Sequence, residues 1–306
     1  MAAADVICVA SFNADLVSRV PRPIARGETL LASGFDIGPG GKGSNAAVAC
    51  ARQGAKVAVV ARIGDDEFGR IALDLWQTEG IATEWVDIAA GERSGVAQIL
   101  VYDDGDNSIA VAVGAGGALG AGQVEAARRA IRSASIVLCC NEVPLAARIA
   151  AFRIAREYGV TTLLNPAPAQ DLPDELLLLS DWLSPNETEA RALAGLAADA
   201  AIDAAAHTLL ARGAQAVIVT LGAAGCVLHR PGYEVLRIPG WPVPVVDTIG
   251  AGDTFTGALA AALSRGEAIA DALRWANAAA ALSVTGAGAI SAMPSREAVA
   301  ALLAQG

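Results

Sequence analysis

Residues 247–257 read Asp-Thr-Ile-Gly-Ala-Gly-Asp-Thr-Phe-Thr-Gly, after an extended apolar run at 242–246 and before an alanine-rich run at 257–263 that predicts a helix. The small residues at 250–252 allow a ligand to approach the backbone closely. A helix that begins just after them directs unpaired N–H groups and the positive end of its dipole toward that ligand. The stretch therefore predicts an anion-binding site.

Asp253 stands at the rim of this predicted anion site. A carboxylate is an unfavourable neighbour for a phosphate unless it has a chemical role, and accepting a proton from a hydroxyl that attacks phosphorus is such a role. The alternative is that Asp253 or Thr254 only caps a buried helix. Residues 247–257 alone do not decide between a base and a cap.

A second glycine-rich loop, Gly-Pro-Gly-Gly-Lys-Gly-Ser-Asn at 38–45, precedes a predicted helix at 46–53 that ends at Gly54. It is not a P-loop, because Gly43 stands where Ser or Thr must follow the Gly-Lys pair. The dinucleotide pattern GxGxxG does match at 38, 40 and 43. That pattern must directly follow a buried strand, and 32–37 is a poor one, so nicotinamide binding is a minor alternative.

Short apolar runs alternate with predicted helices along most of the chain, which predicts a mainly parallel sheet covered on both faces. The predicted strands are 6–11, 56–62, 135–140, 160–164, 182–184 and 216–221. Polar residues follow several of them, as expected for the ligand-binding edge of an open α/β sheet. These are Asn13, Asp15, Asn141, Glu142, Asn165, Asn186 and Thr220.

The runs 83–88 and 95–113 alternate as strands and, with part of 16–37, predict a small separate sheet. Its physical use would be a lid that excludes water from a phosphoryl-transfer site. We therefore expect a single chain, 1–306, in which a lid of about 16–40 and 83–113 is inserted in the main α/β domain.

Composition excludes several classes of protein. The 306 residues carry a net charge of −10 and no basic cluster, which argues against nucleic acid as a partner. The N-terminus lacks a signal-peptide pattern and no long apolar run predicts a membrane span. The five cysteines show no CxxC spacing, which argues against a zinc site or a disulfide framework. We expect a cytoplasmic protein.

Two stretches together resemble the signatures of the PfkB carbohydrate kinases. The first is 40–47, with Gly-Asp-Asp-Glu-Phe-Gly at 64–69 behind it, and the second is 247–257. Further matches lie at 13–15, 165–169, 185–189 and 220–222, so the likeness extends from about residue 5 to 300. The resemblance implies a ribokinase-like three-layer α/β/α fold with a small β-sheet lid.

The resemblance also implies the activity and its residues. The enzyme would use ATP and Mg²⁺ to phosphorylate the primary hydroxyl of D-ribose, with Asp253 as the base. The transferring phosphate would lie on Gly250, Ala251 and Gly252. Sugar hydroxyls would be held by Asn13, Asp15, Gly41, Lys42, Asn45 and Glu142. An aspartate of ordinary pKa would suffice as the base, because the hydroxyl proton leaves late.

The resemblance implies further ligands and a partner. ATP would lie along Asn186, Thr220, Gly222, Gly225, Gly252 and Asn277, with Glu189 near magnesium. Potassium would be bound by Asp247, the Ile249 carbonyl and Gly288. Ala292 replaces a serine that usually reaches this cation, and Gly116 replaces an asparagine in the lid. Pairing of lids would give a homodimer.

Three alternatives remain open. Another sugar or sugar acid, such as fructose, deoxyribose or 2-keto-3-deoxygluconate, would fit the same signatures. A nucleoside fits less well, because three Tyr and five Phe supply little aromatic stacking. A non-catalytic sugar-binding regulator would need neither Asp253 nor the anion site.

Overall fold

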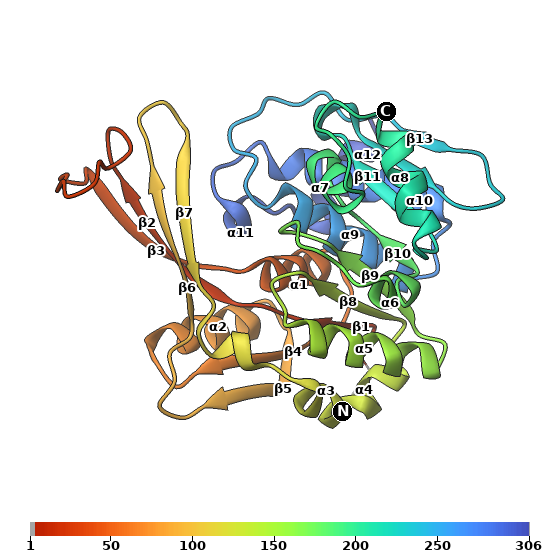
Figure 1. The fold of residues 1–306 in the computed structure, drawn as a ribbon, viewed down its shortest axis with the longest axis horizontal. Coiled ribbons are helices and arrows are strands. Elements are labelled where there is room, and N and C mark those ends of the chain that lie inside the picture. Colours follow the sequence, from red (N-terminus) through yellow and green to blue (C-terminus); the bar gives the residue numbers. More distant parts are fainter. Residues whose placement is uncertain (1–3, 306) are drawn as a thin grey trace.

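The large sheet has the strand order β13-β12-β11-β10-β9-β8-β1-β4-β5 in the computed structural model, which describes residues 4–305 (Figure 1). Its strands are β1 (Val6–Val9), β4 (Val57–Gly64), β5 (Ala82–Ala89), β8 (Ile136–Cys140), β9 (Thr161–Asn165), β10 (Trp182–Leu183), β11 (Val217–Thr220), β12 (Cys226–His229) and β13 (Leu236–Ile238). Neighbours from β5 to β11 are parallel, whereas β12 and β13 are added antiparallel.

Helices cover both faces of this sheet. One face packs against α1 (Lys42–Arg52), α2 (Glu67–Thr78), α9 (Ala251–Ser264), α10 (Ile269–Ser283) and α12 (Arg296–Leu303). The other packs against α3 (Ala121–Ala126), α4 (Arg128–Ser133), α5 (Leu145–Glu157), α6 (Asp174–Leu178), α7 (Glu187–Leu193) and α8 (Ile202–Ala211). Successive side chains of β1 enter opposite cores, as the two-residue period of a strand requires. The expected three-layer α/β/α fold is confirmed.

A second sheet, in the order β3-β2-β6-β7, extends away from this body (Figure 1). It consists of β2 (Asn13–Arg19), β3 (Gly34–Gly40), β6 (Gly95–Val101) and β7 (Asn107–Ala112). The expected second segment, 83–113, was wrong at its start, because β5 pairs in parallel with β4 at the edge of the large sheet. After a helix, the chain commonly returns to the sheet that it left. Strand β5 follows β4 and α2 in this way.

Other boundaries also differ from the sequence predictions. The predicted helix 121–133 is divided at Ala127 into α3 and α4. Short helical segments add η1 (Gly114–Ala118), η2 (Gly222–Ala224) and α11 (Ala289–Ala292). A single domain was predicted over residues 1–306, and its ends, 1–3 and 306, lie outside the described residues. Among residues 4–305, no helix has the length and apolarity needed to span a bilayer.

Candidate active site

Helix α9 begins earlier than predicted, at Ala251, and brings Asp253 into its first turn. Gly250 is the N-cap residue, with a φ of 77° that favours glycine. Asp253 is buried, and its two carboxylate oxygens accept hydrogen bonds from side-chain amides: Asn45 Nδ2 at 3.0 Å and Asn165 Nδ2 at 3.3 Å. The capping interpretation was therefore wrong: Gly250 occupies the cap position, and the Asp253 carboxylate binds side chains from α1 and β9.

The surroundings of Asp253 make it a stronger base than an exposed aspartate. Burial raises its pKa to about 6, and the charge of Lys42 and the amide of Asn45 oppose this shift. The negative charge of Asp253 is in turn the main cause that raises the pKa of Lys42. A carboxyl with a pKa near 6 is mostly ionised at neutral pH but accepts a proton more readily than one of ordinary pKa.

The loop before α1 is bound tightly to the end of β1. The Gly43 N–H donates to Ser11 Oγ at 3.0 Å, while Ser11 Oγ and the Lys42 N–H both donate to Glu142 Oε2, at 2.7 and 2.9 Å. Gly41 has a φ of 92°, and a Cβ there would lie 2.8 Å from Phe12 Cα. Position 41 thus requires glycine, and the network brings Glu142 to the start of α1.

A cavity of about 210 Å³ lies between the segment after β1, the segment 142–144 and the end of β7. Of the residues predicted to bind the sugar, Asn13 and Glu142 line it, and Val111, Val113 and Gly116 contribute from β7 and the segment after it. Gly41, Lys42 and Asn45 lie in the adjoining loop and helix. Asp15 packs against Gly40, and burial and the charge of Glu142 raise its pKa to about 6.

Asn45 has one further feature that concerns a ligand. Its Nδ2 group binds Asp253, while its buried Oδ1 atom has no hydrogen-bond partner among residues 4–305. A buried acceptor without a partner is costly, and a sugar hydroxyl would satisfy it. Asn45 therefore fits a role in sugar binding beside the candidate base.

A larger cavity, about 480 Å³, lies on the other side of the start of α9. Five residues predicted to bind ATP line it: Thr220, Gly222, Gly225, Gly252 and Asn277. Asn277 donates to the Ile238 and Pro239 carbonyls at 3.3 and 3.4 Å. Much of the remaining wall is apolar, with Trp241, Pro242, Val243, Val245, Phe255 and Val284. These apolar residues were not predicted, although the Pro- and Val-rich run 241–246 follows a strand and precedes the anion site.

Asn186 and Glu189, which were predicted to lie near ATP and magnesium, form the start of α7 rather than part of a cavity wall. Asn186 and Glu189 make a reciprocal capping box, with the Glu189 N–H bound to Asn186 Oδ1 at 2.8 Å and the Asn186 N–H bound to Glu189 Oε2 at 2.9 Å. Asn186 also bridges to Thr220, which lines the larger cavity. Asn186 therefore lies beside the larger cavity.

The predicted cation loop is organised by Asp247. Its carboxylate accepts the Ile249 N–H at 3.0 Å and the Gly288 N–H at 2.8 Å. Gly288 thus presents its N–H group to Asp247. Ser291, the serine nearest to the replaced position Ala292, donates instead to the Ala287 carbonyl at 2.6 Å.

Comparison with known proteins agrees with this geometry. The family described as pfkB family carbohydrate kinase matches residues 3–296. A ribokinase of Haemophilus influenzae is 41% identical over 289 residues, which cover 94% of each chain. A deoxyribokinase of Salmonella typhi is 35% identical and covers 96% of each chain. The structure of Arabidopsis thaliana ribokinase complexed with ribose and ATP is 33% identical, covers 99% of each chain and has a TM-score of 0.91.

Proposed function

Since this chain belongs to the pfkB family of carbohydrate kinases, we propose that it transfers the γ-phosphate of ATP to the primary hydroxyl of D-ribose, forming ribose 5-phosphate. One observation carries the chemistry. Asp253, a buried carboxyl with a pKa of about 6, lies in the first turn of α9, directly after two residues that line the larger cavity. It is also bound to Asn45 and in the field of Lys42 and Glu142, beside the smaller cavity.

In this mechanism ribose occupies the smaller cavity and the nucleotide the larger one. Asp253 accepts the proton of the attacking hydroxyl, and the amides of Asn45 and Asn165 fix its carboxylate. The N–H groups at the start of α9 stabilise the charge of the transferring phosphoryl group. Positioning and charge stabilisation of this kind are what phosphoryl transfer requires.

The sugar would be recognised through its hydroxyls. Asn13 and Glu142 line the smaller cavity, and Asp15 lies close enough to Glu142 to feel its charge. A site built to bind a hydroxyl discriminates strongly against an analogue without it, because its buried polar groups are then left unpaired. The deoxyribokinase relative makes 2-deoxyribose the alternative sugar to test.

Two ions belong to the proposal. When bound, Mg²⁺ would neutralise part of the charge on the nucleotide phosphates. Glu189 fits a place near it, because only its Oε2 atom is used in the capping box. Potassium would use the Asp247 carboxylate and the Ile249 carbonyl, but Gly288 offers Asp247 an N–H and Ala292 offers no side-chain oxygen.

The small sheet would act as the lid of the sugar site, because Val111 and Val113, at the end of its strand β7, line the smaller cavity. It also exposes apolar side chains, among them Phe35 and Ile37 on β3. We propose that two copies of the chain pair through these sheets. The enzyme would act in the cytoplasm, where ATP is available and its five cysteines remain thiols.

The test is ADP formation by the wild-type chain with MgATP and a panel of acceptors. The panel contains D-ribose, 2-deoxyribose, fructose, 2-keto-3-deoxygluconate and adenosine, and phosphorylated products are identified by mass spectrometry. We expect kcat/KM to be highest for D-ribose, with product phosphorylated at the primary hydroxyl. Higher kcat/KM with another acceptor would reassign the substrate, and binding of ribose without turnover would favour the sugar-binding regulator.

A further inference from the structure

Four segments join the small sheet to the body, and they meet at one end of it. Asn13 begins β2 and pairs with both Gly40, the end of β3, and Gly95, the start of β6. Ala112, the end of β7, pairs with Val96. Two of these junctions, at 11–13 and 40–42, contain the segment after β1 and the loop before α1, which were described above. The other two, at 92–95 and 113–116, have no role in the proposed chemistry so far.

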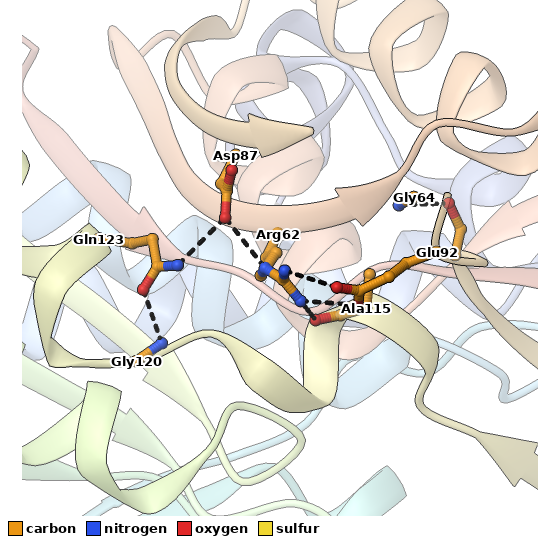
Figure 2. Close-up of polar contacts among 8 residues, drawn as sticks. Arg62, Gly64, Asp87, Glu92, Ala115, Gly120 and Gln123 are labelled. Carbon is orange, nitrogen blue, oxygen red and sulfur yellow. Dashed lines mark hydrogen bonds and ion pairs between the residues drawn. The ribbon is translucent and has the colours of Figure 1, made fainter. Parts of the chain in front are cut away.

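Arg62 binds both of these remaining junctions (Figure 2). From β4, its two Nη groups bind the Glu92 carboxylate at 2.8 Å each, just before β6, and Nη1 also donates to the Ala115 carbonyl at 3.2 Å, just after β7. Its Nε donates to Asp87 on β5 at 2.9 Å. Gln123 of α3 binds the same Asp87 oxygen at 3.0 Å. A bidentate arginine–carboxylate pair fixes direction as well as distance.

Asp66 fixes the same junction from the other side. It is the N-cap of α2, in the 64–69 motif, and accepts the Gly69 N–H at 2.8 Å. Its buried carboxylate also accepts the Ser94 N–H at 2.9 Å and the Ser94 hydroxyl at 2.7 Å. Ser94 Oγ in turn accepts the Gly64 N–H at 2.9 Å, one of the contacts drawn in Figure 2. We call Arg62, Asp66, Glu92 and Ser94 the hinge anchor.

The anchored junctions touch the sugar site directly. A Cβ at Gly95 would lie 2.3 Å from Asn13 Oδ1, so the backbone next to Ser94 packs against a sugar-site side chain. Gly116, next to Ala115, lines the smaller cavity. The two junctions are also joined to each other, because the Ala115 N–H donates to the Arg93 carbonyl at 2.8 Å. A displacement at the hinge anchor would therefore move two walls of the sugar cavity.

We infer that the hinge anchor positions the sugar site: Arg62 and Asp66 hold the two junctions of the small sheet so that Asn13 and the 113–116 segment return to the same place whenever the sheet covers the cavity. The 64–69 motif thereby gains a role, since Gly64 and Asp66 are two of its members. None of these residues touches the reacting atoms. They are positioning residues, and this inference rests on the proposed function for its kinetic test.

The decisive variant is Arg62→Met, which keeps much of the aliphatic chain but removes the bonds to Glu92, Asp87 and Ala115. We expect the KM for ribose to rise about 10- to 100-fold while the KM for ATP stays within about twofold, because a small misplacement at a binding site is costly. Arg62→Lys should recover part of the loss, because it restores the positive charge. Arg128→Met is the matched control, since Arg128 also binds two carboxylates, Glu125 and Glu157, but no residue of the hinge anchor.

Hydrogen exchange measured by mass spectrometry gives a second readout that needs no substrate. In Arg62→Met, amide exchange should rise in peptides covering 90–95 and 113–119 and stay unchanged in helix α8. Glu92→Gln is tested in parallel, in case Arg62→Met does not fold. This variant weakens one junction but keeps the Arg62 side chain.

Unchanged exchange at the two junctions, a uniform rise over the whole chain, or an equal rise in both KM values would overturn the inference. If the wild-type chain phosphorylated no sugar at all, the proposed function would fail, and exchange alone would decide whether Arg62 holds the junctions.

Discussion

At the scale of single residues, Asp253 combines two requirements that usually conflict. A catalytic base must be oriented, and the amides of Asn45 and Asn165 orient it. Hydrogen bonds to a carboxylate also lower its pKa, which weakens it as a base. Here burial exceeds that effect, and the pKa remains raised, at about 6. The site therefore has a fixed carboxylate that still accepts a proton readily.

Replacing Asp253 by asparagine tests its role as the base. Asn cannot take the proton, so kcat with ribose and MgATP should fall by about 10²–10⁴. The fold should tolerate the change, because the Asn45 amide has a free Oδ1 atom and a rotated amide would accept the new N–H group. Ribose binding measured by calorimetry should survive, since the lost interaction acts mainly in the transition state. Asp253→Asn protein of wild-type melting temperature that kept more than about a tenth of its turnover would contradict this role.

The charge of Lys42 should set the pH range of activity. Asp253 and Asp15 both have pKa values of about 6, and Lys42 lowers both. Because the base must be ionised, kcat/KM for ribose should fall as the pH falls below about 6. Lys42→Met removes the lowering charge, so both pKa values should rise and the acid limb should move to higher pH. The measurement is kcat/KM between about pH 5 and 9. The quantity compared is the pH at the midpoint of the acid limb, not the maximal value of kcat/KM. An acid limb that stayed in place or moved to lower pH would be the opposite result.

At the scale of elements, the crossing of α1 and α9 sets the distance between Asn45 and Asp253, one residue on each helix. The helices lie close together at Gly257, where a Cβ would lie 2.3 Å from the Ala46 carbonyl and 2.7 Å from Ala49 Cβ. Gly257→Ala should therefore separate the helices and cost about 1–3 kcal/mol of stability through overpacking. It should also lower kcat, because the 3.0 Å bond between Asn45 and Asp253 depends on this contact.

The control for Gly257→Ala is the same substitution at Gly122 of α3, where a Cβ would have no atom within 4 Å. There alanine should be neutral or stabilise the chain by up to about 1 kcal/mol, because alanine has less conformational freedom to lose on folding than glycine. Thermal melting compares the two variants directly. Equal effects at both positions would mean that the approach of α1 and α9 does not depend on Gly257.

The sequence predicts buried elements well and elements at the edges poorly. The strands at 6–9, 136–140 and 217–220 are buried on both faces, and continuous apolar runs mark them. Strand β5 alternates like a strand of the small sheet, and alternation does not specify which sheet a strand joins. Strands β12 and β13 are short and follow a turn, so they give little periodic signal. Helix α9 begins at Ala251 because Gly250 adopts a left-handed conformation, which composition alone does not reveal.

The candidate site follows the same division. Asp253, Asn13, Glu142 and the glycines of both loops were predictable, because the signatures contain them or strands end at them. Ser11 and Asn165 were not assigned roles, since a hydroxyl that links Glu142 to Gly43 and an amide that binds Asp253 depend on contacts between distant segments. The run 242–246 was predicted as extended and apolar but not as a wall of the larger cavity, because that role depends on contacts with distant segments.

At the scale of the whole molecule, the two sheets divide the work. The larger cavity, proposed for the nucleotide, lies at the start of α9 beside β11 of the large sheet. The small sheet lines the smaller cavity, proposed for the sugar, through Val111 and, just after β7, Val113. Only the junctions near Asn13, Gly40, Gly95 and Ala112 connect the two. The proposed sugar site therefore lies at these junctions, and its geometry depends on how they are fixed.

The exposed apolar side chains of the small sheet predict its pairing with a second copy. Phe35 is 59% exposed and Ile37 51% exposed on β3, and both point to the face opposite Asp15, because their partners Ser18 and Leu16 alternate with Asp15 along β2. Apolar side chains gathered on one face of an exposed sheet mark an interaction surface.

Light scattering of the wild-type chain at micromolar concentration should therefore give the mass of a dimer. The double variant Phe35→Ser, Ile37→Thr should shift the chain to a monomer without lowering its melting temperature by more than a few degrees. Phe35 and Ile37 point away from the sugar face, so the loss of dimer should leave the architecture of the smaller cavity intact within each chain. Val235→Ser is the control, since Val235 is 44% exposed but lies outside the small sheet, and it should leave the mass unchanged. A wild-type monomer, or a double variant that remains dimeric, would place the cover of this face elsewhere.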